Sequence, residues 1–162
     1  MEFQEIKSNL AISNLAIKGI SGRSVPNPGG SYIAVNVRGN IAYVAIQFPI
    51  DQGVLHYAGK LGKEVTTIEG YQAARIAAMN ILGQIEKHLG FEKIEGLNHL
   101  DIYYAADGEW NESPTIADGA SDLFLEVLGD QGKHTRALFG VERLPGFACV
   151  GVTGGVYAFG IV

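Results

Sequence analysis

Two short stretches in the first third of the chain have the character of strands. Residues 32–37 place Ile33, Val35 and Val37 on one face, and residues 41–48 follow as a second strand after Gly39, which can take the positive φ of a tight turn. A period of two is typical of a β-strand that buries one face, so the pattern predicts a β-hairpin. Ahead of the hairpin, residues 2–11 are compatible with a short helix and residues 19–30 with a loop rich in Ser, Gly and Pro.

The spacing then changes to that of a helix. Thr66 and Glu69 fit a capping box, in which the hydroxyl and the carboxylate each accept a hydrogen bond from a free backbone amide of the first turn. Gly90 is suited to the position just after the last turn. The apolar positions between these signals recur at helical spacing: Ala74, Ala78, Ile81, Leu82, Ile85 and Leu89. We expect a long amphipathic helix here.

A second helix is predicted further along the chain. Ser113 is suited to the N-cap, with Pro114 at the first helical position, and Gly129 closes the segment. The apolar face between them is formed by residues at helical spacing: Ile116, Ala120, Leu123, Phe124, Val127 and Leu128.

Three further stretches have the character of strands, over residues 97–105, 135–143 and 147–161, whereas residues 49–63 are expected to form a loop. The order of elements is therefore ββαβαββ. Strands grouped at both ends with two helices between them favour an α+β fold, with one mixed sheet and both helices packed on one face. No linker or repeat divides the chain, so residues 1–162 are expected to form a single domain.

Composition narrows the range of functions. The chain has 162 residues, of which 47% are hydrophobic and 18% charged, with a net charge of −5. This acidic balance disfavours a nucleic-acid partner, because phosphate backbones are negative as well. The start of the chain is acidic rather than basic, and the apolar C-terminal stretch is too short and too rich in glycine to span a membrane. We expect a cytoplasmic protein that makes no contact with membranes.

Metal and cofactor signals are weak. Cys149 is the only cysteine, and in an apolar strand it is expected to be a small core residue. No metal-binding spacing connects the histidines, and no glycine-rich segment has the pattern of a nucleotide fingerprint. We therefore expect neither a metal nor a cofactor. The four histidines are His56, His88, His99 and His134.

One charged residue interrupts an apolar strand. Arg136 shares a strand face with Leu138 and Gly140 by the period of two. A guanidinium in such a place requires an anionic partner, which is either a carboxylate of the protein or the carboxylate of a ligand. The pattern by itself favours a structural ion pair and leaves the ligand site open.

The segment that follows carries a family resemblance. Residues 136–145, RALFGVERLP, resemble the R-x-x-V-x-V-x-x-L-P signature of the RidA/YjgF family. Members of this family are reactive-intermediate deaminases, also known as L-PSP endoribonucleases or translation inhibitors. The resemblance extends from about residue 28 to the C-terminus, and residues 57–62 and 118–123 are similar to its longer subgroup. Residues 1–27 are then a variable N-terminal extension.

The resemblance implies a chorismate-mutase-like fold and a homotrimer with clefts between subunits. In deaminating members, an arginine binds the carboxylate of a 2-imino or 2-enamino acid while water attacks the imine carbon, yielding a 2-keto acid and ammonia. Arg136 matches this arginine, and Tyr32 and Gln47 match residues that line the same cleft. The implied ligand is a small carboxylate-bearing metabolite.

The chain also departs from the family pattern. A cleft asparagine is replaced by Asp118, the family's S-G-Q is Ala45-Ile46-Gln47, and the glutamate that orients the hydrolytic water is replaced by Gly151. Asp118 is the expected catalytic substitute for that glutamate if it faces the cleft, and Glu126 and Glu142 are alternatives.

Three functions follow from the match and its departures. The first is a hydrolase that deaminates reactive imines with Arg136 and Asp118 in catalytic roles and with Tyr32, Gln47 and Gly151 at the substrate. The second is a non-catalytic trimer that binds a small carboxylate ligand, which the loss of the glutamate favours. The third is an L-PSP-type endoribonuclease, which ranks last because 17 acidic residues outnumber 12 Lys and Arg.

Overall fold

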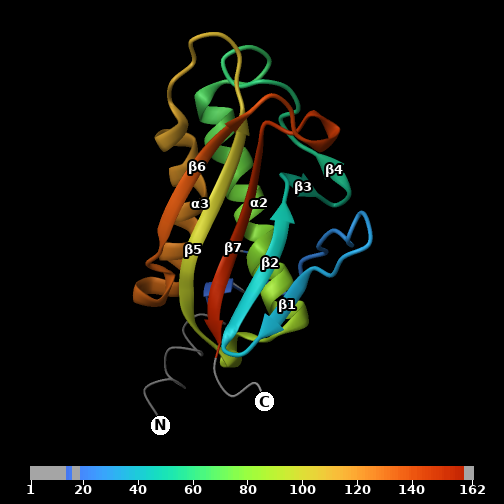
Figure 1. Cartoon of the computed structure of the whole chain (residues 1–162), viewed down its shortest axis with the longest axis vertical. Helices are drawn as coiled ribbons and strands as arrows, with labels where there is room; N and C mark the ends of the chain where they lie inside the picture. Colours follow the sequence, from blue (N-terminus) through green and yellow to red (C-terminus); the bar gives the residue numbers. More distant parts are fainter. Residues whose placement is uncertain (1–13, 16–18, 159–162) are drawn as a thin grey trace.

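A five-stranded mixed sheet forms one layer of the molecule (Figure 1). The computed structural model describes residues 14–15 and 19–158. Strands follow the spatial order β1-β2-β7-β5-β6, in which β5 and β6 are parallel and the other neighbours antiparallel. Their bounds are β1 Val35–Arg38, β2 Ile41–Gln47, β5 Ile94–Ala105, β6 Thr135–Val141 and β7 Val150–Ala158.

Two helices form the second layer and lie on the same face of the sheet (Figure 1). They are α2, Thr67–His88, and α3, Ser113–Leu128, which pack against each other along their lengths. Leu100, Ile102 and Val152 point from the sheet into the layer between, and all three are fully buried. The predicted α+β fold, with two helices on one face of a mixed sheet, is confirmed.

The start of α2 matches the sequence prediction. The Thr66 hydroxyl accepts a hydrogen bond from the Glu69 amide, and the Glu69 carboxylate accepts one from the Thr66 amide. At the other end, Gly90 has a φ of +88° and its amide donates to the Ile85 carbonyl oxygen. Both capping signals were therefore local enough to be identified from the sequence.

The start of α3 differs by one residue. Glu112 is the N-cap, without a side-chain cap, and Ser113 is already helical. Glu112 instead accepts a hydrogen bond from the Thr67 hydroxyl at the start of α2. This tertiary contact holds the first turn of α3, so the predicted Ser113 cap is not needed. Gly129 ends the helix as expected, with a φ of +59°.

Several strand boundaries also differ from the prediction. β1 begins only at Val35, because Tyr32 closes a tight turn through its amide to the Gly30 carbonyl oxygen. The last strand begins at Val150 because a short 3₁₀ turn, η3 (Pro145–Phe147), precedes it. The predicted helix over residues 2–11 and the end of the last strand beyond residue 158 lie outside the described residues.

The remaining short elements lie in the connections. Contrary to the expected loop over residues 49–63, β3 (Ile50–Asp51) and β4 (Val54–Leu55) form a small hairpin. Single 3₁₀ turns, η1 (Phe91–Lys93) and η2 (Gly129–Gly132), lead into β5 and β6.

The second face of the sheet carries exposed apolar side chains. Along β7, Gly151, Thr153 and Gly155 alternate with the core residues, so they belong to this face. Tyr103 of β5 stacks on Phe139 of β6, with ring centroids 5.1 Å apart. Large apolar residues exposed on this face are Ile41, Tyr43, Phe139 and Tyr157. Within the described residues, no helix is long and apolar enough to cross a membrane.

Gly119 sets the closest approach of the two helices. A Cβ at this position would collide with the backbone carbonyl oxygen of Tyr71 in α2. We expect Gly119→Ala to destabilise the fold by about 1–3 kcal/mol, because neither backbone can move without repacking the core. Urea unfolding followed by tryptophan fluorescence measures the loss. Gly30→Ala is the control, since its Cβ would make only ordinary contacts at 3.5 Å or more with Tyr32. Equal midpoints for the two variants would contradict this account of the helix contact.

Candidate functional site

Arg136 lies on the helix-facing side of the edge strand β6. Its register partner in β5 is the fully buried Leu100, so its side chain is directed toward α3. Nη1 donates to Asp118 Oδ1 at 2.8 Å and to Ser121 Oγ at 3.0 Å. Nη2 makes a longer contact of 3.4 Å with the Pro114 carbonyl oxygen. The guanidinium therefore has the protein carboxylate that the sequence pattern favoured.

The pair with Asp118 leaves part of the guanidinium available. Both short bonds use Nη1, so Nε and one hydrogen of Nη2 have no hydrogen-bond partner among the described residues. The Arg136 side chain is 25% exposed and that of Asp118 is 52% exposed. A guanidinium held by one edge can still offer another edge to a carboxylate.

A half-buried histidine, His134, extends this network. His134 Nδ1 lies 2.6 Å from the Gly132 carbonyl oxygen, which can only accept, so Nδ1 carries the proton. Nε2 of the neutral ring then accepts from the Ser121 hydroxyl at 2.8 Å. Ser121 in turn accepts from Arg136. The order of donors and acceptors thus fixes Arg136, Ser121 and His134 as one chain of hydrogen bonds.

Partial burial favours the neutral form of this histidine. Desolvation lowers the pKa of His134 below its usual value, although the hydrogen bond to Gly132 opposes this. Electrostatic interactions with Arg136 and, to a smaller extent, with His99 lower the pKa of His134 further. Sequence reasoning missed His134 and Ser121. Their spacing is a usable signal, since His134 is two residues from Arg136 on a strand and Ser121 three from Asp118 on a helix.

Tyr32 and Gln47 line a separate cavity of about 400 Å³ near β1 and β2. The Tyr32 hydroxyl accepts from the Gly29 amide at 3.0 Å, and Gln47 is buried against Gln84 of α2. β7 and β5 separate β2 from β6 in the sheet. One chain therefore does not bring Tyr32 and Gln47 together with Arg136.

Gly151 lies beneath the side chains of β2. A Cβ at this position would lie 2.7 Å from Ile46 Cδ1 and 2.9 Å from Phe48 Cε1. The two departures from the family pattern are thus coupled in space. Ile46 fills the volume that a longer residue at position 151 would need.

Of the three candidate carboxylates, Asp118 is the one beside Arg136. Glu126 instead binds Arg75 of α2, with 2.6 Å between Arg75 Nη2 and Glu126 Oε2. Glu142 lies after the end of β6, where its carboxylate is 3.6 Å from Lys60 Nζ. The structure gives these two residues other partners.

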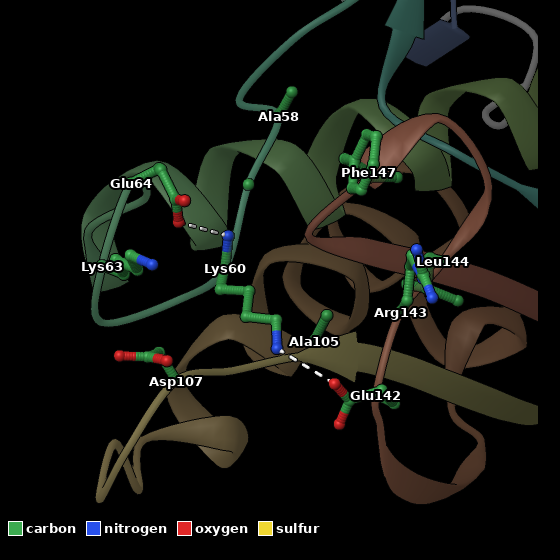
Figure 2. A pocket seen from close by; sticks show the side chains of 12 residues that line it. Ala58, Lys60, Lys63, Glu64, Ala105, Asp107, Glu142, Arg143, Leu144 and Phe147 are labelled. Carbon is green, nitrogen blue, oxygen red and sulfur yellow. Dashed lines mark hydrogen bonds and ion pairs between the residues drawn. The ribbon is translucent and has the colours of Figure 1, made fainter.

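A larger cavity lies where β5 and β6 end (Figure 2). It measures about 550 Å³, and residues of the 57–62 and 136–145 segments are among those that line it. Lys60 crosses it toward Glu142, while its backbone amide donates to Glu64 (Figure 2). Backbone hydrogen bonds, chiefly that from Lys60, lower the pKa of Glu64. Since Lys63, Arg143 and Asp107 complete the charged lining, its positive and negative charges balance.

The lone cysteine lies in the hydrophobic core rather than at a reactive site. Cys149 is fully buried in the core, where desolvation raises the pKa of its thiol to about 12. Its predicted place in the core is confirmed. Across residues 14–15 and 19–158, no group of three or more His, Cys, Asp or Glu side chains is arranged to hold a metal ion.

A family profile matches residues 12–154, nearly the whole sequence. It describes a "YjgF/chorismate mutase-like, putative endoribonuclease" family. The chain belongs to this family, in agreement with the resemblance of its 136–145 segment. Protein TCP17 of Trypanosoma cruzi is 30% identical over 149 residues, covering 91% of this chain and 93% of that protein.

Two solved structures support the same placement. A "putative endoribonuclease" of Shewanella oneidensis is 30% identical, with a TM-score of 0.87 over 91% of this chain and 98% of that one. Atu1372 of Agrobacterium tumefaciens, described as having unknown function, is 29% identical, with a TM-score of 0.83 over 96% of both chains.

The His134 network predicts a dependence of stability on pH. Because the folded state lowers the pKa of His134, the unfolded state binds more protons between that pKa and the usual value near 6.5. Stability should therefore fall as the pH is lowered through this window. Thermal unfolding between pH 7.5 and 5 is expected to show a smaller loss for His134→Gln than for the wild type. His88→Gln, at the exposed end of α2, is the control and should follow the wild type. Parallel curves for all three proteins would contradict the assignment.

Proposed function

We propose that this protein binds a small carboxylate-bearing metabolite at Arg136 and hydrolyses its reactive 2-imino or 2-enamino form to a 2-keto acid and ammonia. The observation that carries the proposal is the guanidinium itself. Hydrogen bonds to Asp118 and Ser121 hold it on an edge strand, while Nε and part of Nη2 stay available for a ligand carboxylate. Preorganisation of this kind lowers the entropic cost of binding.

The proposed cleft lies between copies of the chain in a homotrimer. Arg136 and the Tyr32 cavity belong to opposite parts of the sheet, so a site that uses both requires a neighbouring subunit. The exposed apolar side chains of the second sheet face, with Tyr43 64% exposed, offer a surface for such assembly. Family membership supports the same arrangement. The cytoplasmic location and the absence of a cofactor stay predictions from the sequence.

Asp118 has the catalytic role in this proposal. With the substrate carboxylate on Arg136, a water molecule adds to the imine carbon and gives a carbinolamine. Asp118, being partly exposed beside the guanidinium, accepts a proton from the attacking water. Asp118 passes this proton, and then that of the carbinolamine hydroxyl, to the nitrogen, so that the C–N bond breaks, ammonia leaves and the oxygen becomes the carbonyl of the keto acid.

A second candidate function is binding without turnover. The observation that favours it is the close packing of Ile46 and Phe48 over Gly151. The family's water-orienting glutamate is absent, and apolar side chains occupy its surroundings. The endoribonuclease description of the relatives receives no comparable support, since the chain has a net charge of −5.

Substitution of Arg136 tests the proposal directly. In the assay, an amino-acid oxidase generates a 2-imino acid, and semicarbazide traps it. The protein competes with semicarbazide for the imine. We expect the wild type to accelerate loss of the imine, and Arg136→Ala to reduce this by about tenfold to a hundredfold, the value of a charged hydrogen-bonded anchor. Arg75→Ala is the matched control, because Arg75 also forms an ion pair with a carboxylate of α3, that of Glu126. This variant should keep the wild-type rate.

The outcomes separate the two candidates. Arg136-dependent turnover supports the deaminase. Absence of turnover across a panel of amino acids, together with Arg136-dependent binding of pyruvate in calorimetry, supports the non-catalytic reading. Equal behaviour of the wild type and Arg136→Ala in both assays contradicts both. Light scattering on each variant establishes whether the compared proteins are trimers.

A pair of substitutions tests whether the coupled departures suppress catalysis. Gly151→Glu by itself should lower the thermal midpoint, since its Cβ meets Ile46 and Phe48. Ile46→Gly combined with Gly151→Glu removes the nearer of the two contacts, so that only the Phe48 ring has to shift to admit the carboxylate. We expect the double variant to exceed the wild type in imine loss by at least about a hundredfold, a common contribution of general acid–base groups. Ile46→Gly alone is the control, and a double variant no faster than it would show that the cleft serves another purpose.

A further inference from the structure

Two buried glutamines lie between α2 and β2. Gln84 is 1% exposed and Gln47 is 5% exposed. Gln84 Nε2 donates to the Pro26 carbonyl oxygen at 2.8 Å and to Gln47 Oε1 at 3.2 Å. Gln47 Nε2 donates to the Ala45 carbonyl oxygen at 3.0 Å. The Pro26 carbonyl can only accept, so the nitrogen of Gln84 must face it, which fixes the orientation of this amide.

One acceptor is left over by this arrangement. Gln84 Oε1 is buried and makes no hydrogen bond within the part of the chain that the structure describes. Buried polar atoms are nearly always paired, because the hydrogen bond to water lost on burial must be replaced. Gln84 Oε1 thus calls for an N–H or O–H donor from outside the described chain.

Gln84 is also one of the side chains that line the 400 Å³ cavity beside Tyr32. Neither Lys, Arg, Asp nor Glu is among the lining residues. An ammonium group in such a cavity would have no carboxylate to balance its charge, so a neutral donor fits better. Apolar side chains make up much of the rest of the lining, among them Pro26, Ala34, Ile46, Phe48, Ile50 and Pro145.

We propose that this cavity binds a neutral, mainly apolar group that carries a single hydrogen-bond donor, such as a phenol, an alcohol or an indole, with the donor on Gln84 Oε1. The assignment of this group to the metabolite rests on the proposed function. In that case the carboxylate end of the metabolite binds Arg136 of one copy, and its neutral end enters this cavity of the neighbouring copy. The cavity itself belongs to one chain, so its preference for a donor can be measured without Arg136.

A matched pair of probes tests the donor requirement. p-Cresol and p-xylene have nearly the same shape and differ by a hydroxyl in place of a methyl. Dissociation constants are measured by titrating protein with ¹³C-labelled isoleucine methyl groups, since Ile46 and Ile50 line the cavity. The ratio of the p-xylene constant to the p-cresol constant is expected to be about tenfold higher in the wild type than in Gln47→Met/Gln84→Met, which removes both amides from this wall.

Control variants separate this effect from general damage. Gln131→Met removes a glutamine that also donates to a backbone carbonyl, that of Glu95, but lies outside the cavity, and it should keep the wild-type ratio. If the double variant does not fold, the ¹³Cδ resonance of Gln84 in the wild type decides. It should shift with p-cresol and not with p-xylene.

Two results would overturn the inference. One is a p-cresol preference that persists when both amides are gone. The other is binding of neither probe, or equal effects of both on the Gln84 resonance. Neither probe has a carboxylate, so Arg136→Ala should leave both constants unchanged. If the proposed function is wrong, the affinity for pyruvate will be the same in the wild type and in Arg136→Ala. The two failures are therefore distinguishable.

Discussion

The parallel pairing of β5 and β6 is the constraint on which the candidate site depends. Parallel neighbours cannot be joined by a hairpin, so the chain must cross from the end of one strand to the start of the next. Here α3 makes that crossing and lies on the helix-covered face. Arg136, whose side chain points to the same face, therefore meets Asp118 and Ser121 of α3. A different connection would leave the guanidinium without a partner.

The hydrogen-bond network around Arg136 holds the guanidinium in place and leaves some of its N–H groups available. Asp118 balances the charge of Arg136, and Ser121 links it to the neutral ring of His134. These contacts fix the position of the guanidinium without using all of its donors. An ion pair within the protein and a ligand carboxylate are thus compatible partners of one arginine. The two interpretations that the strand pattern left open are not exclusive in this geometry.

The other half of the proposed site shows how substitutions are coupled by packing. Gly151 and Ile46, which stand where the resembled family pattern has a glutamate and a small residue, are far apart in the sequence. In the structure, Ile46 lies directly over Gly151, so the missing side chain at position 151 leaves room for the large one at position 46. The nearby Gln84–Gln47 pair adds an acceptor without a partner among the described residues, in a cavity without charged walls. This side of the site therefore differs in polarity from the Arg136 side.

Features that depend on local physics or on the family signature could be predicted from the amino-acid sequence. The capping box at Thr66, the glycine after α2 and the apolar faces of both helices are set by neighbours a few residues apart, and the structure has them. The order of the two helices and the five sheet strands along the chain, and the burial of Cys149, were also predicted correctly. Three contacts became apparent only in the folded chain: Arg136 with Asp118, His134 with the same network, and Ile46 over Gly151. The tertiary structure also shifted the start of α3 by one residue, through the contact between Thr67 and Glu112. These contacts join side chains from different elements, and their pairing follows from sheet order and helix placement, which no local pattern encodes.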